Sequence, residues 1–272
     1  MTPRTAVLLA MGLLLLPAPL PAQANLPPRG KIDAVERGAR GTASDDTDDG
    51  DDGDDPWWVD IALDVLGAVF RTPKRPGQGY LPYPYAAPPP GARETFVLEN
   101  VARRRRYGVL SFDRFSDASS TLRGTSIAFE GATAVLHYGL EYTRYREPKA
   151  GETDRLDSYR AALGVAARTG RAGVFRLAVA LRAVCLDDGN CAGGGDFEMG
   201  LLLLPARPLG LSGTLRVGGV EWPGGPTVAV LETNAAVSLF VGRMEVRAGW
   251  HWLEFEGATA FAGPRLGARV WF

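Results

Sequence analysis

The sequence predicts an all-β fold, a closed antiparallel barrel of about ten strands spanning residues 95–272. Three observations predict it. Segments of alternating apolar and polar residues recur between turn signals, at a spacing of roughly 10–20 residues. Tight turns alternate with longer, more polar connections. No run of apolar residues reaches the roughly 18 residues of a membrane-spanning helix, and the alternating strands of a barrel would not be detected by this test.

Residues 1–24 have the features of a secretory signal peptide. Arg4 provides the charged start, residues 6–16 are an apolar core, and Ala22-Gln23-Ala24 is a small-x-small cleavage site. We therefore expect an exported protein whose mature chain begins at Asn25.

The next segment, residues 25–55, shows no apolar periodicity and is predicted to be disordered. Eight of the chain's 31 acidic residues lie between Asp45 and Asp55, and like charges at this density oppose folding. The spacing of these acids does not fit an EF-hand loop, because Thr47 breaks the pattern. The remaining 23 acidic residues face 30 Lys and Arg, so a basic body follows an acidic segment.

Residues 56–70 predict an amphipathic helix, with Pro56 in its first turn. Asp60 and Asp64 mark its polar face, which favours docking on protein over lying on a membrane, where Lys and Arg are usual. The helix could cap the barrel or bind a partner protein through its apolar side chains. Those side chains are Trp57, Trp58, Ile61, Leu66 and Phe70. A Pro-rich linker follows at residues 71–94.

Ten strands are predicted in the remaining chain. They cover residues 106–115, 121–130, 133–146, 157–169, 172–184, 195–205, 210–221, 227–241, 243–256 and 261–272. The first two mix polar and apolar residues on both faces, so a barrel of eight strands is the alternative. Tight turns, such as Gly170-Arg171 and Gly242-Arg243, are predicted at one end. Longer connections, such as residues 147–156 and 186–194, are predicted at the other.

Each strand carries an apolar face and a charged face. Leu140, Leu163, Leu177 and Val246 belong to the apolar face, which we expect outside. We expect the other face to enclose a charge network. Its members are Glu141, Arg160, Arg168, Arg176, Arg182, Glu198, Arg216, Glu232, Glu245, Arg247, Arg265 and Arg269. Aromatic girdles are predicted near strand ends, at Tyr142, Tyr145, Tyr159, Phe197, Trp252 and Phe272.

The two cysteines, Cys185 and Cys191, flank a short polar turn. In an oxidising compartment we expect a disulfide between them, whereas in a cytosolic protein they would be free thiols. Too few ligands lie nearby for a zinc site, and no metal or cofactor is expected.

The last strand ends on an aromatic residue and places Leu266, Ala268, Val270 and Phe272 on one face. This pattern resembles the C-terminal strand of bacterial outer-membrane β-barrel proteins with eight to ten strands. The resemblance implies a transmembrane barrel in the outer membrane, in contact with lipid. It also implies recognition of Leu266, Val270 and Phe272 by the barrel-insertion machinery. The C-terminus and the N-terminal extension would then lie in the periplasm.

The sequence predicts little about activity. The expected role is that of a structural or interaction protein with a charge-filled lumen, possibly a subunit of a larger envelope complex. A narrow anion-preferring channel is the alternative, since Arg outnumbers Glu in the predicted lumen. A lipid hydrolase or acyltransferase built on His137, Glu141 and Ser158 is the third interpretation. No catalytic residue is assigned, no enzyme activity is expected, and no nucleic-acid motif is present.

Overall fold

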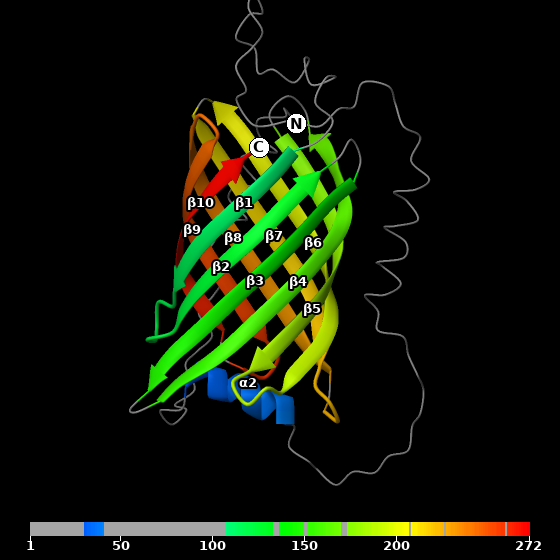
Figure 1. Cartoon of the computed structure of the whole chain (residues 1–272), viewed down its shortest axis with the longest axis vertical. Coiled ribbons are helices and arrows are strands. Elements are labelled where there is room, and N and C mark those ends of the chain that lie inside the picture. The colour runs from blue at the N-terminus through cyan, green and yellow to red at the C-terminus, as the bar shows by residue number, and fades with distance from the viewer. Residues whose placement is uncertain are drawn as a thin grey trace, which may run out of the picture.

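The computed structural model describes residues 30–40, 107–132, 136–149, 152–169, 173–206, 208–225, 227–258 and 260–272. In these ranges it contains one helix, α2 (Lys31–Arg40), and ten strands. The strands are β1 (Tyr107–Ser116), β2 (Arg123–Ala132), β3 (Leu136–Lys149), β4 (Glu152–Thr169), β5 (Gly173–Leu186), β6 (Cys191–Ala206), β7 (Leu209–Glu221), β8 (Thr227–Val241), β9 (Met244–Phe255) and β10 (Phe261–Trp271). Each pairs antiparallel with the next, and β1 pairs with β10, so the sheet closes into a barrel (Figure 1).

The predicted fold class is confirmed, and the eight-stranded alternative is wrong. All ten strands lie where the alternation placed them, including the first hairpin. The ladder between β1 and β10 runs from Val109↔Trp271 to Phe115↔Arg265. Because this ladder joins the first strand to the last, the described sheet has no free edge.

The connections sort to the two ends of the barrel as predicted, but the longest predicted loop is absent. The C-terminus and the last residues of β2, β4, β6 and β8 lie at one end, here called the terminal mouth. The last residues of β1, β3, β5, β7 and β9 lie at the other end, the loop mouth. The predicted loop at residues 147–156 is wrong, since β3 and β4 stay paired to Lys149↔Glu152. Those polar residues extend a hairpin beyond the apolar part of the wall.

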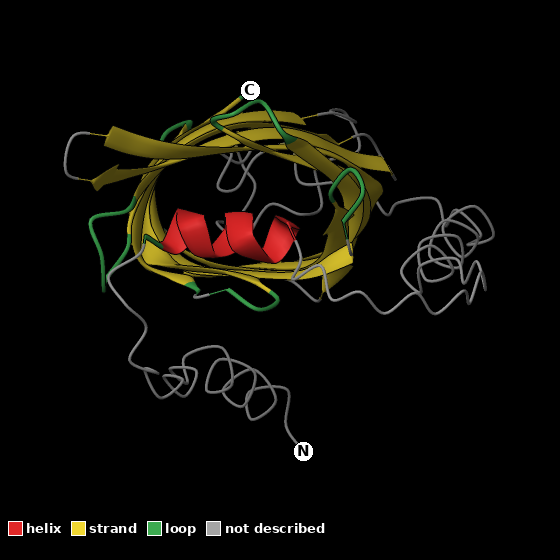
Figure 2. Cartoon of the chain, turned by 90° about the horizontal axis from the view of Figure 1, so that it is seen from below, coloured by secondary structure: helices red, strands yellow, loops and turns green. Residues whose placement is uncertain are grey.

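Helix α2 lies at the loop mouth and crosses its opening (Figure 2). The prediction that residues 25–55 are disordered is therefore wrong for Lys31–Arg40. Ile32 and Val35, three residues apart on one helix face, are each only 3% exposed. Two apolar residues in a polar segment give little periodicity, and the apolar partner surface comes from the distant barrel. This helix is not long and apolar enough to cross a membrane.

Several predictions lie outside the described residues. They are the signal peptide at 1–24, the acidic run at 45–55, the amphipathic helix at 56–70 and the linker at 71–94.

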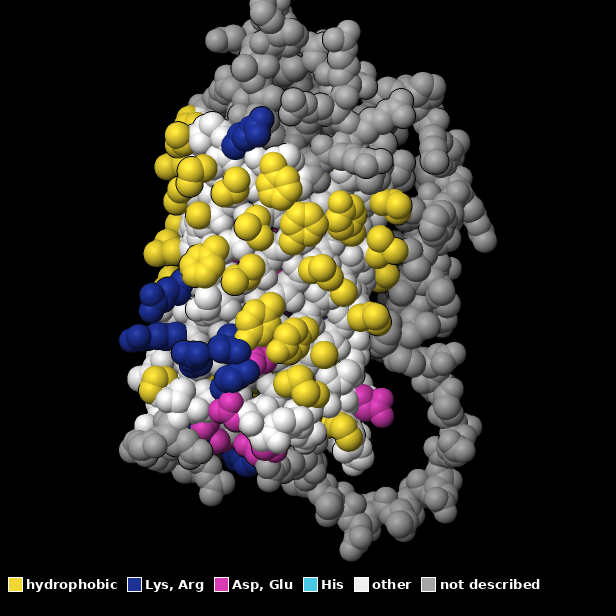
Figure 3. Space-filling view, viewed as in Figure 1, with side chains coloured by type: hydrophobic (Ala, Val, Ile, Leu, Met, Phe, Trp, Pro, Cys, Tyr) yellow, Lys and Arg dark blue, Asp and Glu magenta, His cyan; other side chains and the backbone are white. Residues whose placement is uncertain are grey.

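The outside of the barrel is apolar, as predicted. Leu140, Leu163 and Val246 are 60%, 45% and 55% exposed. Large apolar side chains cover the wall in a band, with Lys and Arg gathered on its loop-mouth side (Figure 3). In a water-soluble protein these side chains would be inside. The predicted girdle positions are also on the outer face, except Tyr145, which points inward and is 3% exposed.

The interior is filled in three layers, and the two apolar layers were not predicted from the sequence. At the loop mouth, apolar side chains pack together with Ile32 and Val35 of α2. At the terminal mouth a second apolar cluster includes Val109, Phe240 and Trp271. The charged side chains lie between these clusters. The inward face of most strands is thus apolar at its ends and charged only at mid-height.

The predicted disulfide is present. Cys185 and Cys191 are direct partners in the β5–β6 ladder and are joined by an S–S bond. The turn between them is shorter than predicted. Gly193 and Gly194, which belong to the predicted connection 186–194, lie within β6.

We expect Gly194→Ala to destabilise the barrel by about 1–3 kcal/mol, because the added carbon has no room. It would lie 2.0 Å from the carbonyl oxygen of Gly219 on the neighbouring strand. The adjacent Gly193 has no heavy atom within 4 Å of such a carbon, so Gly193→Ala is the matched control. Urea unfolding of the two variants, refolded in detergent, measures the difference. Equal stabilities would contradict the close approach of β6 and β7.

Candidate functional site: the charged lumen

Arg216 on β7 forms the centre of the charged layer. Its Nη2 lies 2.7 Å from Glu141 on β3, its Nε 2.9 Å from Glu198 on β6, and its Nη1 2.8 Å from Glu232 on β8. One guanidinium thus binds carboxylates from three strands. Such charge-assisted hydrogen bonds are among the strongest that side chains form.

Arg160 and Arg182 extend this cluster through a shared carboxylate, Asp196 on β6. Arg160 lies 2.7 Å from Asp196 and 2.8 Å from Glu198. Arg182 lies 2.9 Å from Asp196 and 2.7 Å from Glu232. All of these groups are buried. Each carboxylate therefore has two arginines, which is what burial of charge requires.

A second cluster lies around the closure of the barrel. Asp113 on β1 accepts hydrogen bonds from Arg247 and Arg265. Gly267 makes this possible, since a side-chain carbon there would lie 1.8 Å from Asp113 Oδ1. Glu130 pairs with Arg176 at 2.5 Å, and with Arg269 at 3.7 Å.

Glu245 is fully buried beside this second cluster. It accepts hydrogen bonds from Ser238 at 2.7 Å and from the Trp271 indole at 2.9 Å. Arg269 lies 3.9 Å away. Trp271 of the last strand, β10, thus donates a hydrogen bond to the Glu245 carboxylate on β9.

The layer is electrically balanced, unlike the predicted lumen. Its described members are seven arginines and seven carboxylates, counted from the ion pairs. The arginines are Arg160, Arg176, Arg182, Arg216, Arg247, Arg265 and Arg269. The carboxylates are Asp113, Glu130, Glu141, Asp196, Glu198, Glu232 and Glu245.

Eleven of the twelve predicted network residues point into this layer, and the side chain of the twelfth, Arg168, is outside the description. Asp113, Glu130 and Asp196 also belong to the layer but are not among the predicted network residues. Asp113 and Glu130 lie on the first hairpin, whose inward face is mixed. Asp196 lies in the predicted strand 195–205 and alternates with Glu198, so the period of two would have placed it in the lumen.

Both histidines, His137 and His251, are buried inside the barrel. His251 bonds to Tyr145 Oη through Nε2, at 3.0 Å, and to Asn234 Oδ1 through Nδ1, at 2.8 Å. Because the amide oxygen can only accept, Nδ1 carries the proton and Nε2 accepts from the tyrosine. Both ring nitrogens of His251 are therefore hydrogen-bonded within the barrel.

The residues proposed for hydrolysis are not brought together. Ser158 pairs with Thr143, six residues along β3 from His137. Six residues of strand span about 20 Å, far beyond hydrogen-bond reach. Among the described residues, no group of three or more His, Cys, Asp or Glu is placed to hold a metal ion.

Helix α2 is fixed to the loop mouth by polar contacts. Lys31 Nζ lies 2.9 Å from Asp117 and donates to the carbonyl oxygen of Ala260 at 2.6 Å. The Ile32 amide donates to Glu147 at 3.0 Å. Burial would raise the pKa of Asp117, but hydrogen bonds from Lys31 and from the Ala262 amide outweigh it and hold that pKa below its ordinary value. A hydrogen bond from Lys149 likewise lowers the pKa of Asp33.

The predicted insertion residues lie on the outer face of β10 and at its end. Leu266, Val270 and Phe272 are 63%, 43% and 59% exposed. The Phe272 ring lies 6.2 Å from Phe129. The backbone of Phe272 pairs with Gly108 through two hydrogen bonds. The chain end is therefore part of the wall.

Comparison with known proteins gives a likeness of shape alone. No family model matches the chain, and no curated protein matches it. Among solved structures, "Outer-membrane expressed OmpT of Vibrio cholerae" matches at TM-score 0.34 and 10% identity, over 56% of this chain and 57% of that one. Neisserial surface protein A (NspA) matches at TM-score 0.26 and 16% identity, over 61% and 94%. CdiB from Acinetobacter baumannii matches at 0.22 and 8%, over 62% and 60%.

At these TM-scores the likeness carries no argument, and the chain spans just over half of the first structure. The closed sheet, the apolar outer band and the enclosed charge layer decide the class. The chain has the architecture of a closed, ten-stranded antiparallel β-barrel with an apolar outer surface. The terminal strand that suggested this family from the sequence closes the barrel against β1.

We expect Arg216→Met to lower the unfolding free energy by about 3–5 kcal/mol, because it leaves buried carboxylates without their central cation. Adding Glu141→Gln should recover part of the loss, since Glu141 has no other cation within 3.5 Å among the described residues. Urea unfolding in detergent, followed by the gel shift between folded and boiled protein, measures this. Arg243→Met, at an exposed turn, is the control and should change stability by less than about 0.5 kcal/mol.

Helix α2 should stay docked at neutral pH and loosen in acid. Asp117 and Asp33 have lowered pKa values, so their contribution is fully present above the ordinary value of 3.8 and is lost as pH falls through the lowered values. Amide hydrogen exchange at Ile32 to Val35, compared at pH 7 and pH 3 after correction for intrinsic rates, should show the change. Asp117→Asn should weaken docking already at pH 7. Unchanged protection in both tests would contradict this assignment.

Proposed function

We propose that this protein is a closed, lipid-embedded barrel of the bacterial outer membrane, with a structural or interaction role rather than a transport role. One observation carries the proposal: a balanced ion-pair layer fills the lumen between two apolar layers. The hollow beside Arg216 and Glu232 measures about 10 Å³, roughly the space of one water molecule.

This arrangement of paired charges does not favour the channel interpretation. Anion pores use rings of cationic side chains that face water. Here each of the seven lumen arginines whose side chains are described is paired with at least one carboxylate, and α2 lies across the loop mouth. The hydrolase interpretation loses its proposed pair of His137 and Ser158.

Orientation follows from the terminal strand. With Phe272 on the periplasmic side, as the resemblance implies, the loop mouth and α2 face outward. The predicted periplasmic position of the N-terminal extension then does not extend to Lys31–Arg40. We propose that the outward face of β10 is recognised by the barrel-insertion machinery. Binding of a partner through residues 56–70 stays a prediction.

The purified, folded chain should give no conductance steps in planar phosphatidylcholine bilayers, in any of several salts. The charge layer leaves no continuous water path, and entry of an ion would break paired charges. Removal of residues 30–40 should not by itself open the barrel, because the charge layer remains. Regular, anion-selective steps from the full chain would overturn the closed-barrel proposal. A mock preparation from cells lacking the protein is the control.

A further inference from the structure

Four rows of outward-facing side chains cross the wall from β1 towards β5, because the registers place them in line. The first row is apolar: Leu110, Phe129, Leu140, Ala161 and Leu181. The second contains Phe112, Ile127, Tyr142, Tyr159 and Ala183. The third contains Arg114, Thr125, Arg144, Asp157 and Cys185. The fourth, nearest the loop mouth, contains Ser116, Arg123, Arg146 and Arg155.

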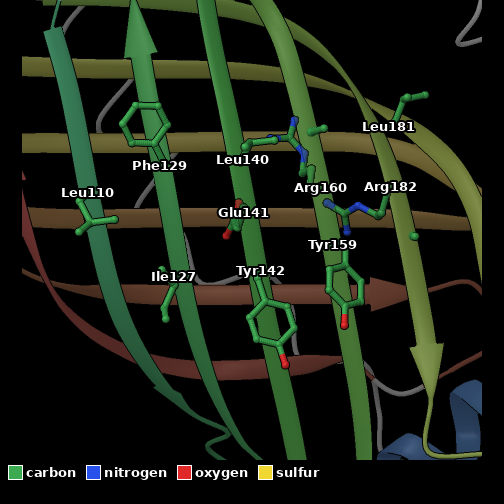
Figure 4. A pocket seen from close by; sticks show the side chains of 12 residues that line it. Leu110, Ile127, Phe129, Leu140, Glu141, Tyr142, Tyr159, Arg160, Leu181 and Arg182 are labelled. Atoms are coloured by element: carbon green, nitrogen blue, oxygen red, sulfur yellow. The ribbon is translucent and has the colours of Figure 1, made fainter. Parts of the chain in front are cut away.

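Residues of the first two rows, except Phe112, line a hollow of about 540 Å³ in the outer wall, and the lumen residues Glu141, Arg160 and Arg182 also border it. Small side chains at Ala161 and Ala183 lie among larger ones, which leaves this space open. Figure 4 shows Leu140 and Leu181 beside it, and the Tyr142 and Tyr159 rings on its loop-mouth side. The two rings lie 5.1 Å apart. A hollow with apolar walls on a lipid-facing surface fits a hydrocarbon chain.

The third and fourth rows concentrate positive charge next to this hollow. Arg123 faces Arg146 directly, and Arg146 faces Arg155. Like charges in direct opposition destabilise a sheet unless an anion lies between them. Within the part of the chain that is described, none of the ion pairs involves Arg114, Arg123 or Arg146, and Arg123 and Arg146 are exposed.

One carboxylate holds part of the cluster in place. Asp157 accepts hydrogen bonds from Arg144 at 2.9 Å and from Tyr142 at 3.0 Å, and it also pairs with Arg155. Five arginines less Asp157 leave a charge of +4, and counting Asp187 in the next turn leaves +3. The cluster therefore keeps an excess of positive charge.

We propose that this surface binds a phosphorylated lipid of the leaflet that faces the loop mouth. The phosphate lies on Arg123, Arg146 and Arg155, and one acyl chain lies in the hollow beside Tyr159. Arginine suits this ligand, since its planar fork binds phosphate oxygens in pairs. The order of the rows matches a lipid molecule, with charge at head-group level, then tyrosines, then hydrocarbon. Rows two residues apart are about 7 Å apart along a strand, so head group and chain are within one molecule's reach.

This inference rests on the proposed placement in a membrane. The test uses the full folded chain in neutral detergent, titrated with diphosphoryl lipid A and examined by native mass spectrometry. The wild type should retain the lipid. Arg123→Gln/Arg146→Gln/Arg155→Gln should weaken binding at least tenfold, while Arg243→Gln, an exposed arginine at the terminal mouth, should not. Filling the hollow with Ala161→Leu/Ala183→Leu should also weaken binding, with the arginines intact.

Two further probes distinguish binding of the whole lipid from binding of its phosphate group alone. Sodium pyrophosphate should compete only weakly, and its binding should not respond to the filled hollow. Diacylglycerol, which lacks phosphate, should not be retained. Equal retention by wild type and the triple variant would overturn the inference, as would pyrophosphate binding as tightly as the lipid. If the triple variant does not fold, the filled-hollow variant and the diacylglycerol comparison decide.

Insertion into phosphatidylcholine vesicles, followed by flotation, keeps the two proposals apart. A chain that inserts but shows no preference for phosphorylated lipid contradicts this inference alone. A chain that does not insert contradicts the proposed function, and this inference with it.

Discussion

The enclosure of charge is the constraint on which the structure depends. Burying one guanidinium without a partner would cost several kcal/mol, a large share of the stability of a domain, so each buried arginine needs a carboxylate partner. Arg216 meets this condition by joining β3, β6 and β8 across the lumen. Asp113 does the same between β1 and the last two strands. The charge pairs thus fix which strands lie opposite one another.

The alternation of side chains predicted the fold well, because both faces of the wall obey it. Leu140 faces out and Glu141 faces in for the same reason, the period of two along a strand. The alternation did not predict the charge balance. Asp196 lies near the start of the predicted strand 195–205, directly after three glycines, and is absent from the predicted network although it alternates with Glu198. Asp113 lies on a strand whose inward face changes from Val109 to Ser111 and then to Phe115. Whether an inward residue is apolar or charged depends on its height along the barrel axis. A local sequence pattern shows which face of the strand a residue occupies but not its height.

The mouth helix shows a second limit of sequence reasoning. Ile32 and Val35 have no large apolar residues beside them in sequence, and they pack in one cluster with residues such as Phe261 from the far end of the chain. The segment was predicted to be disordered from its composition, which indicates only how much apolar surface the segment could bury by itself. The same limit applies to the outer arginines. Arg123, Arg146 and Arg155 look unrelated in sequence and become one surface only through the register of β2, β3 and β4.

The most direct test of the account is the environment of the outer wall in a bilayer. A nitroxide label placed at Leu163→Cys or Val246→Cys, in the chain reconstituted in vesicles, reports its exposure to oxygen and to a water-soluble nickel complex by electron paramagnetic resonance. The account predicts high oxygen and low nickel accessibility at both positions, and the reverse at Arg243→Cys. A label at Leu163 or Val246 that the nickel complex reaches freely, or that is immobile and reached by neither reagent, would contradict it.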